Sequence, residues 1–545
     1  MIFAAVMFAA YNMSAANTAV FSWFDYAGKD SYYSQPLDKP GIAFNPVISG
    51  WASDPSVCRV GDDYWLVTSS FGYYPGVPLY HSRDLVTWRL VDNILRRPPQ
   101  LPHLIGQDIG RGGIYAPTIR YNRLNKTYYM ITTDVGKGHF YVTAEDPRGS
   151  WSDPVWLDAI DGIDPSFFFD DDGRAYVVYK EDVTGQPKWS NHRCIRFIRF
   201  DTVTGKTIGE SQPLREEGVG LGEQLARDEG PHLYKKDGKY YLLCAEGGTA
   251  WAHSEVCYRA DSVMGTYHRW SRNPMLTQRL PKDKEVLPVT CTGHVDMVET
   301  PQGDWWAVFL GCRPWNKDME QLGRETFLMP VKWSQDGFPY ITMTRDTIPL
   351  VQQGPFPVRQ EQAETGNFRW HDDFRGDKLQ SEWLSLRGSV DGMQLSGNGL
   401  LLPCSQQLSS GFGVPSYLGR RIQHHCYEAS TRMVFAPAGG DAAGMLVFKD
   451  ERHQYFLCLT TSGVEVRTMT YSGWKTLATS SENIPMETSL ELKVVCDGSS
   501  YSFQWRIADG RWQIVADGLS ISAVSSSSGG YTDTTIGLYA ENGGK

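Results

Sequence analysis

Short apolar runs separated by polar turns recur along the first 350 residues. Five segments follow one plan: a polar or proline-containing start, an apolar run, a turn, and a second run rich in Tyr or Trp. Most of the turns carry pairs such as Asp-Gly that favour β-hairpins. The strands alternate or are continuously apolar, as in half-buried and buried sheets. The segments begin at Asp54, Ala116, Asp164, Gly230 and His294.

The spacing of these starts predicts the architecture. Prolines follow four of them, at positions 55, 117, 165 and 231, with intervals of 62, 48 and 66 residues, and His294 comes 63 residues after Pro231. Each interval accommodates a hairpin and one or two further strands. Repeats of this length without helical periodicity predict a five-bladed β-propeller over residues 40–350. A solenoid is disfavoured because the intervals vary.

The pattern changes after a polar segment at 351–366, which we interpret as a linker. From Phe368 onward, short alternating strands at regular spacing predict a β-sandwich over residues 367–545. No segment predicts a helix longer than a few turns. The predicted fold class is therefore all-β, a five-bladed β-propeller followed by a C-terminal β-sandwich.

Charge and the N-terminus narrow the class of protein. The 545 residues carry 52 Lys+Arg and 62 Asp+Glu, without a concentrated basic stripe, which argues against a nucleic-acid partner. The apolar run at 1–10 is shorter than the ~20 residues that span a membrane. Because its length suits a signal-peptide core, we expect residues 1–20 to be a signal peptide and the protein to be secreted or periplasmic. No Lys or Arg precedes Lys29, so a truncated leader or mis-set start codon is the alternative.

Ten cysteines are spread over the chain, and none forms a Cys-x-x-Cys pair. A zinc site is therefore disfavoured. Several cysteines, such as Cys244 and Cys312, lie inside apolar runs, which predicts buried thiols that act as small hydrophobic side chains. One or two disulfides remain an open alternative.

Acidic residues stand at the starts of three repeats, and these starts should meet. Asp54 and Asp164 begin the first and third repeats, Glu229 directly precedes the fourth, and His294 begins the fifth. The inner strands of a propeller line its channel, so these side chains should converge at one mouth. Burying several acids is unfavourable unless function or a cation requires it. The alternative is that they are only turn signals at strand entry.

Crowded carboxylates have split proton affinities, so one stays ionised while another is held protonated. Glycoside hydrolysis needs that pair: an acid protonates the leaving oxygen and a base activates water. In inverting enzymes the two lie ~6.5–9.5 Å apart. Asp54 and Glu229, on opposite walls of a narrow channel, could supply such a gap.

Longer stretches around these residues carry a resemblance to a known family. They are Ser53-Asp54-Pro55-Ser56, SSFGYYPGVPLYHSRDLVTW (69–88), GGIYAPTIRY (112–121), GIDPSFFFDDDG (162–173), EGPHLYKKDGKYYLLCAEGGT (229–249), TGHVDMVETPQGDWWAVFLGCRP (292–314) and LGRETFLMPVKW (322–333). From about Gly41 to its end, the chain resembles the family 43 glycoside hydrolases, in the branch of β-xylosidases and α-L-arabinofuranosidases with a C-terminal β-sandwich. That sandwich is expected to be a concanavalin-like jelly roll.

The resemblance implies roles for the converging residues. Asp54 would be the general base, Glu229 the general acid, and Asp164 would orient that acid and keep its pKa raised. Arg324 would hydrogen-bond sugar hydroxyls, with a structural ion pair as the alternative. His294 would be a central histidine, either a satisfied core residue or one near a structural calcium. No cofactor is implied as required, and no direct metal ligand is expected.

The resemblance also implies an aromatic pocket for one sugar. Phe71 and Tyr115 match aromatics of its wall, with core packing as the alternative; relatives usually have Trp at the position of Tyr115. In this branch a sandwich loop closes the pocket. The matching stretch is 525–543, so Tyr531 would be the inserted aromatic, unless this loop is flexible and lies outside the site. A closed pocket implies exo-action.

The leading hypothesis is an exo-acting inverting glycoside hydrolase that releases β-D-xylose or α-L-arabinofuranose from plant cell-wall oligosaccharides or polysaccharides. The motifs do not separate the two sugars, and they do not predict an oligomeric state. A non-catalytic carbohydrate-binding propeller is the alternative in another class. A fructan-cleaving enzyme is disfavoured because Ser53-Asp54-Pro55-Ser56 departs from Asn-Asp-Pro-Asn and no Arg-Asp-Pro occurs.

Overall fold

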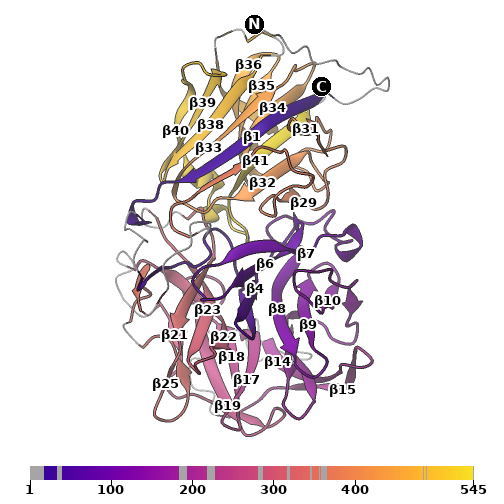
Figure 1. The fold of residues 1–545 in the computed structure, drawn as a ribbon, viewed down its shortest axis with the longest axis vertical. Coiled ribbons are helices and arrows are strands. Elements are labelled where there is room, and N and C mark those ends of the chain that lie inside the picture. Colours follow the sequence, from indigo (N-terminus) through magenta and orange to yellow (C-terminus); the bar gives the residue numbers. More distant parts are fainter. Residues whose placement is uncertain are drawn as a thin grey trace.

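Two β-rich units lie one above the other along the long axis of the molecule (Figure 1). The structure is a computed structural model. It describes residues 17–543 apart from 34–39, 183–192, 218–227, 280–286, 316–319, 344–345, 355, 357–364, 481, 483 and 486–487. Among these residues the only helical elements are short 3₁₀ turns, such as Ser31–Tyr33 and Ile521–Val524, and none is long enough to span a bilayer.

The lower unit is the predicted propeller, with five separate sheets in chain order. Blade one contains β3 (Ser56–Val60), β4 (Asp63–Val67), β6 (Gly76–Ser82) and β7 (Arg89–Leu95). Blade two contains β8 (Ile114–Asn122), β9 (Thr127–Asp134), β10 (Gly138–Ala144) and β11 (Val155–Trp156). Blade three contains β12 (Ile163–Phe169), β13 (Ala175–Asp182), β14 (Arg193–Asp201) and β15 (Lys206–Pro213).

The last two blades differ in size. Blade four contains β17 (Glu229–Lys236), β18 (Lys239–Glu246), β19 (Ser254–Ala260) and β20 (Thr266–Arg269), extended by β16 (Arg215–Glu217) and β21 (Leu276–Thr277). Blade five contains β22 (Thr290–Glu299), β23 (Trp305–Cys312) and β24 (Glu325–Pro330). Val47 donates its amide to Thr326 (2.9 Å) and Ile48 accepts from it (3.1 Å), so the N-terminal side of the propeller sequence closes the ring beside blade five.

The five repeat starts share one unusual backbone conformation. Asp54, Ala116, Asp164, Gly230 and His294 all have φ between 41° and 57°. In blades two to five, the pairing of the inner strand with its neighbour shifts at this point, as at a β-bulge. A bulge in the left-handed region re-aims a side chain out of the regular alternation. The sequence repeat is therefore a repeated backbone conformation at the entry of each blade, and it brings Asp54, Asp164, His294 and, one residue before Gly230, Glu229 to one pocket.

The upper unit is a sandwich of two antiparallel sheets. One has the order β30 (Gln394–Leu395), β31 (Leu400–Pro403), β1 (Thr18–Gly28), β33 (Cys426–Val434), β38 (Leu490–Asp497), β39 (Ser500–Ile507) and β40 (Gln513–Ser520), with β28 (Arg369–Asp372) also on β1. The other has the order β32 (Tyr417–Arg421), β41 (Thr535–Asn542), β34 (Asp441–Asp450), β35 (His453–Thr460), β36 (Gly463–Thr470) and β37 (Gly473–Thr479).

Strand β1 corrects the predicted domain boundaries. It precedes the propeller in sequence, yet it lies in the middle of a sandwich sheet, as the indigo strand of Figure 1 shows. Phe21 and Phe24 are fully buried there, and Phe24 pairs with Thr431. The sandwich therefore comprises residues 18–28 as well as 367–543. The expected signal peptide, 1–20, overlaps β1 by three residues, and residues 1–16 lie outside the described part, so the leader stays a prediction.

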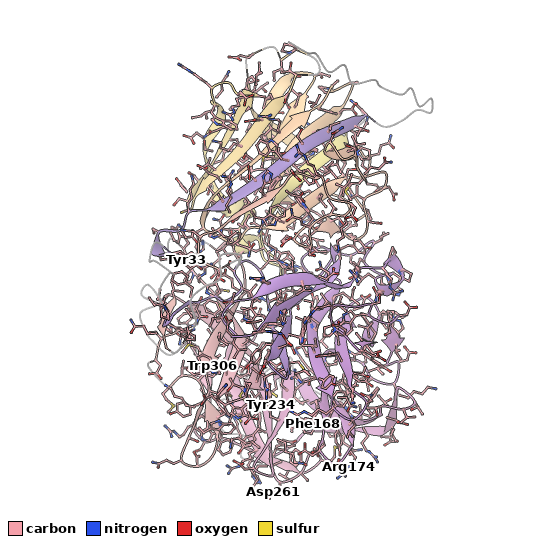
Figure 2. All side chains as sticks on the ribbon, in the orientation of Figure 1. Tyr33, Phe168, Arg174, Tyr234, Asp261 and Trp306 are labelled. Atoms are coloured by element: carbon pink, nitrogen blue, oxygen red, sulfur yellow. The ribbon has the colours of Figure 1, made fainter. Side chains whose placement is uncertain are left out.

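The two units share a continuous apolar contact. Strand β5 (Tyr73–Tyr74) of the propeller pairs with β29 (Ser385–Leu386) of the sandwich. Phe71 and Tyr73 belong to the same buried cluster as Leu386 and Tyr417. Figure 2 shows Tyr33 at the same junction, where it accepts a hydrogen bond from Arg313 of blade five (3.1 Å). The sandwich is thus seated on the mouth of the propeller, while no disulfide joins any of the ten cysteines.

Candidate active site

A small pocket at the mouth nearest the sandwich contains every residue singled out from the sequence. These residues are Asp54, Phe71, Tyr115, Asp164, Glu229, His294, Arg324 and Tyr531. The pocket has a volume of about 80 Å³. A pocket this small matches one sugar unit better than several. The predicted convergence of the repeat starts is therefore confirmed.

Asp54 is ionised because cations and donors surround it. Its Oδ1 lies 3.2 Å from Nη1 of Arg324 and 3.3 Å from Nδ1 of His294. Its Oδ2 accepts hydrogen bonds from the hydroxyls of Ser69 (2.6 Å) and Ser53 (3.0 Å). Burial alone would raise the pKa of Asp54, but the charge of Arg324 and the hydrogen bond from His294 outweigh it and lower that pKa well below its usual range. The arrangement fits a permanent base.

Ser69 fixes the orientation of this base. The amide of Ala116 donates to the Ser69 hydroxyl (2.8 Å), so the oxygen of Ser69 is an acceptor on that side and its proton points to Asp54. The bulge of blade two thereby sets the carboxylate on blade one through one hydroxyl.

His294 is a cation in this pocket. Burial would lower its pKa, but the hydrogen bond and charge of Asp54 raise it to about 9. A protonated imidazole has no lone pair to offer a metal ion. No group of three His, Cys, Asp or Glu side chains among the described residues is arranged to hold one. The donor set therefore does not favour the calcium that the resemblance allowed near His294, and no step below uses it.

Blades three and four bring the second and third carboxyl groups to the pocket. Burial raises the pKa of Asp164 to about 6, even though the charge of His294 opposes the shift, and the carboxylate of Glu229 adds to it. Oδ2 of Asp164 accepts the amide proton of Gly230 (3.0 Å), which ties it to the residue after Glu229. Asp164 is thus held beside Glu229, and its role in orienting that acid stays a prediction.

Glu229 does not have the raised pKa that was expected from its contact with Asp164. Nζ of Lys180 lies 2.5 Å from Oε2 of Glu229, and both side chains are mostly buried. Burial would raise the pKa of Glu229, but the charge and hydrogen bond of Lys180 outweigh it and lower the pKa. The proton affinities of the pair are therefore split, and Asp164 is the member whose pKa is raised.

His253 is a further polar group in the pocket. Its Nδ1 lies 2.9 Å from the carbonyl oxygen of Cys291, which only accepts, so Nδ1 carries the proton. Burial lowers its pKa to about 4, which keeps the ring neutral. Nε2 is then an acceptor.

Three aromatic rings form one wall. The centroids of Phe71 and Tyr115 lie 5.3 Å apart in an edge-to-face pair, and Tyr531 stacks on Phe71 at 6.3 Å. The guanidinium of Arg324 lies 5.5 Å from the Tyr531 ring, and the Tyr531 amide donates to the carbonyl of Gly110 (2.8 Å). The alternative of a flexible loop outside the site is therefore wrong, because the sandwich supplies part of the pocket wall.

The sequence reasoning missed Lys180, His253 and Ser69. Lys180 lies near the end of β13, the second strand of blade three, and pairs with Ile163, next to Asp164. Counting paired positions back from the Asp172-Gly173 turn of this hairpin would have placed Lys180 close to Asp164. His253 and Ser69 carry no comparable signal, since their placement depends on contacts between blades.

Comparisons with known proteins agree with the geometry. Residues 43–339 match the model of glycosyl hydrolases family 43, and residues 371–545 match that of the beta xylosidase C-terminal concanavalin A-like domain. The chain is 34% identical over 522 residues to a non-reducing end alpha-L-arabinofuranosidase of Bacteroides ovatus, covering 92% of each. It is 36% identical over 529 residues to a xylosidase/arabinosidase of Butyrivibrio fibrisolvens, covering 92% of this chain and 96% of the relative.

A solved structure shares both units. The crystal structure of a GH43_12 protein retrieved from a capybara gut metagenome superposes with a TM-score of 0.88 at 35% identity, over 96% of this chain and all of that one. Together with the matched family models, this shows that the chain belongs to glycosyl hydrolase family 43 and is a glycosidase.

Proposed function

We propose that the protein removes single terminal β-D-xylose or α-L-arabinofuranose units from plant cell-wall oligosaccharides or polysaccharides, with inversion at the anomeric carbon. The observation that carries this proposal is that one small pocket contains both an ionised Asp54 and the protonatable pair Asp164 and Glu229. The printed names of the two relatives cover both sugars, which supports both as candidates.

Each group has one task in the proposed reaction. Asp54 accepts a proton from a water molecule, whose oxygen then bonds to the anomeric carbon. Glu229 gives its proton to the glycosidic oxygen as the bond from that oxygen to the anomeric carbon breaks, so the alcohol leaves neutral. The leaving group covers Glu229 and excludes water, which raises its pKa and favours transfer of the proton held by the pair from Asp164 to Glu229. Arg324 and His294 stabilise Asp54 as a carboxylate.

The test uses aryl β-D-xyloside and aryl α-L-arabinofuranoside with the wild type, Asp54→Asn and Glu229→Gln. We expect turnover of at least one substrate, and about 10³-fold or greater loss in Asp54→Asn. Glu229→Gln should lose far more activity on an alkyl than on an aryl pentoside, because an aryl leaving group needs less protonation. Proton NMR should show the inverted anomer first. Binding without turnover in the wild type would favour the non-catalytic propeller, and a retained anomer would refute the water mechanism.

Export to the periplasm or medium remains a proposal that rests on residues 1–20 alone. Mass spectrometry of the N-terminus of the protein made in its own cells tests it: loss of a leader before β1 is expected, and an intact Met1 would contradict it.

A further inference from the structure

A buried lysine in the sandwich has no part in the reaction described above. Lys449 lies on β34, and only 1% of it is exposed. Lysine is among the residues least often buried, because an ammonium ion loses its hydration unless other groups replace the water. The position therefore needs an explanation that sandwich packing alone does not provide.

Two backbone carbonyls replace that hydration, and they flank the pocket tyrosine. Nζ of Lys449 donates to the carbonyl of Gly529 (3.0 Å) and to that of Thr532 (2.6 Å). The residues between these carbonyls are Gly530 and Tyr531. The charge of Lys449 also lowers the pKa of the buried Asp533, although burial dominates and keeps that pKa raised to about 6.

The turn that carries Tyr531 is shaped to fit between the two units. Gly529 and Gly530 have φ of 81° and 85°, which side chains other than glycine rarely adopt. A Cβ on Gly530 would lie 3.6 Å from both Nζ of Lys449 and the carbonyl oxygen of Gly110. The sandwich lysine thus holds the turn on one side, and on the other the Tyr531 amide donates to Gly110 of the propeller.

A second cavity, of about 260 Å³, lies on the glycine side of the same turn. Gly110, Lys449, Gly529 and Gly530 are part of its lining, together with Arg111 and Phe412. Tyr531 itself faces the catalytic pocket. The turn therefore stands between a pocket for one sugar and a space that a second sugar unit could enter.

We propose that Lys449 is a positioning residue that holds the Tyr531 turn in place, and that this contact restricts the pocket to one terminal sugar. The proposal deepens the proposed function and rests on it. Without the ammonium ion, the carbonyls of Gly529 and Thr532 lose their shared donor. The turn then moves, the wall made by Tyr531 and Phe71 loosens, and the sugar is bound less well, while Asp54 and Glu229 remain in place on the propeller.

The test compares Lys449→Met and Lys449→Arg with Tyr531→Ala, the double variant Lys449→Met/Tyr531→Ala, and a control. Lys493→Met is the control because Lys493 also lies in the sandwich but on β38, in the other sheet. Lys449→Met should raise KM for the aryl pentoside about tenfold with kcat changed less than about threefold, since it loses hydrogen bonds of a charged donor. Lys449→Arg should restore most of the affinity.

The double variant separates positioning from general stability. If Lys449 acts through Tyr531, Lys449→Met should add no further rise in KM in the Tyr531→Ala background. Additive effects would overturn the proposal, as would a KM for Lys449→Met equal to that of Lys493→Met. Lys449→Met should also release products longer than a single sugar from an oligosaccharide, which wild type does not.

Hydrogen exchange on the full-length protein gives a readout without substrate. Amides of residues 526–533 should exchange faster in Lys449→Met, with the remaining sandwich strands unchanged. Unchanged exchange at residues 526–533 would refute the role of Lys449, whatever the activity of the wild type. A wild type that hydrolysed neither pentoside would refute only the proposed function. Faster exchange throughout the sandwich would assign Lys449 a purely structural role.

Discussion

Replacing Lys180 by Met should move the alkaline limb of the pH–rate profile to higher pH. The limb of kcat/KM reports loss of the acid's proton in the free enzyme. Lys180 stabilises the ionised form of Glu229 and so lowers its pKa. The charge of Lys180 lowers the pKa of Asp164 as well, so without the cation the Asp164–Glu229 pair keeps its shared proton to higher pH, and the limb moves upward.

The size of the shift follows from the geometry. At 2.5 Å between Nζ and Oε2, an effective dielectric constant of about 20 gives an attraction of about 7 kcal/mol. Most of this attraction is offset by the cost of desolvating both groups and by water that enters after the Lys180→Met substitution. A remainder of about 1.4–2.8 kcal/mol corresponds to about one to two pH units.

The assay compares an alkyl pentoside with an aryl pentoside across the pH range. The shift should appear with the alkyl substrate, whose leaving group needs protonation, and be much smaller with the aryl one. Lys235→Met is the matched control, since Lys235 forms a similar ion pair with Asp170 (2.7 Å) outside the pocket. The assignment would be refuted if the alkaline limb of the pH–rate profile did not move in a folded Lys180→Met protein. Glu229 would then not be an acid whose pKa is set by Lys180.

Three further substitutions test other contacts. Arg324→Met should raise the pKa of Asp54, so the acid limb of kcat/KM should move to higher pH; an unmoved limb would argue that Arg324 acts only on the sugar. Ser69→Ala should lower kcat about tenfold, because Asp54 loses a hydrogen bond that orients it. Full activity in steady-state assays would contradict the role of Ser69 in orienting Asp54. Phe24→Ala should lower the free energy of unfolding by about 3–5 kcal/mol, measured by denaturant titration, because Phe24 packs against Trp383 (5.2 Å); an unchanged midpoint would show that β1 is dispensable.

The five-fold repeat was predictable because its cause is local. Each start combines a turn-forming residue with a strand entry, and the structure adds that all five adopt left-handed φ. Once the starts are equivalent, the convergence of Asp54, Asp164 and Glu229 follows from propeller geometry. These are the features that a single sequence encodes through short-range pattern.

Other features depend on contacts between distant segments. Lys180 reaches Glu229 across blades three and four, 49 residues apart, and this contact reverses the expected order of proton affinities. Strand β1 pairs with β33 some 400 residues later. A short amphipathic strand near the N-terminus carries no sign of which sheet it will join, because the pairing is decided by burial of Phe21 and Phe24 in a core built by the other end of the chain.

The path of the chain explains how a sandwich loop can serve as a wall of a propeller pocket. The chain leaves the sandwich after β1, builds all five blades, and returns at β28, which pairs with β1 itself. The propeller is therefore connected to the sandwich at two points rather than one. A double connection, together with the β5–β29 pairing and the shared apolar cluster, restricts relative motion far more than a single linker would. Only with that restriction can the contact of Lys449 with the Tyr531 turn, made within the sandwich, fix the distance between Tyr531 and Phe71 on the propeller.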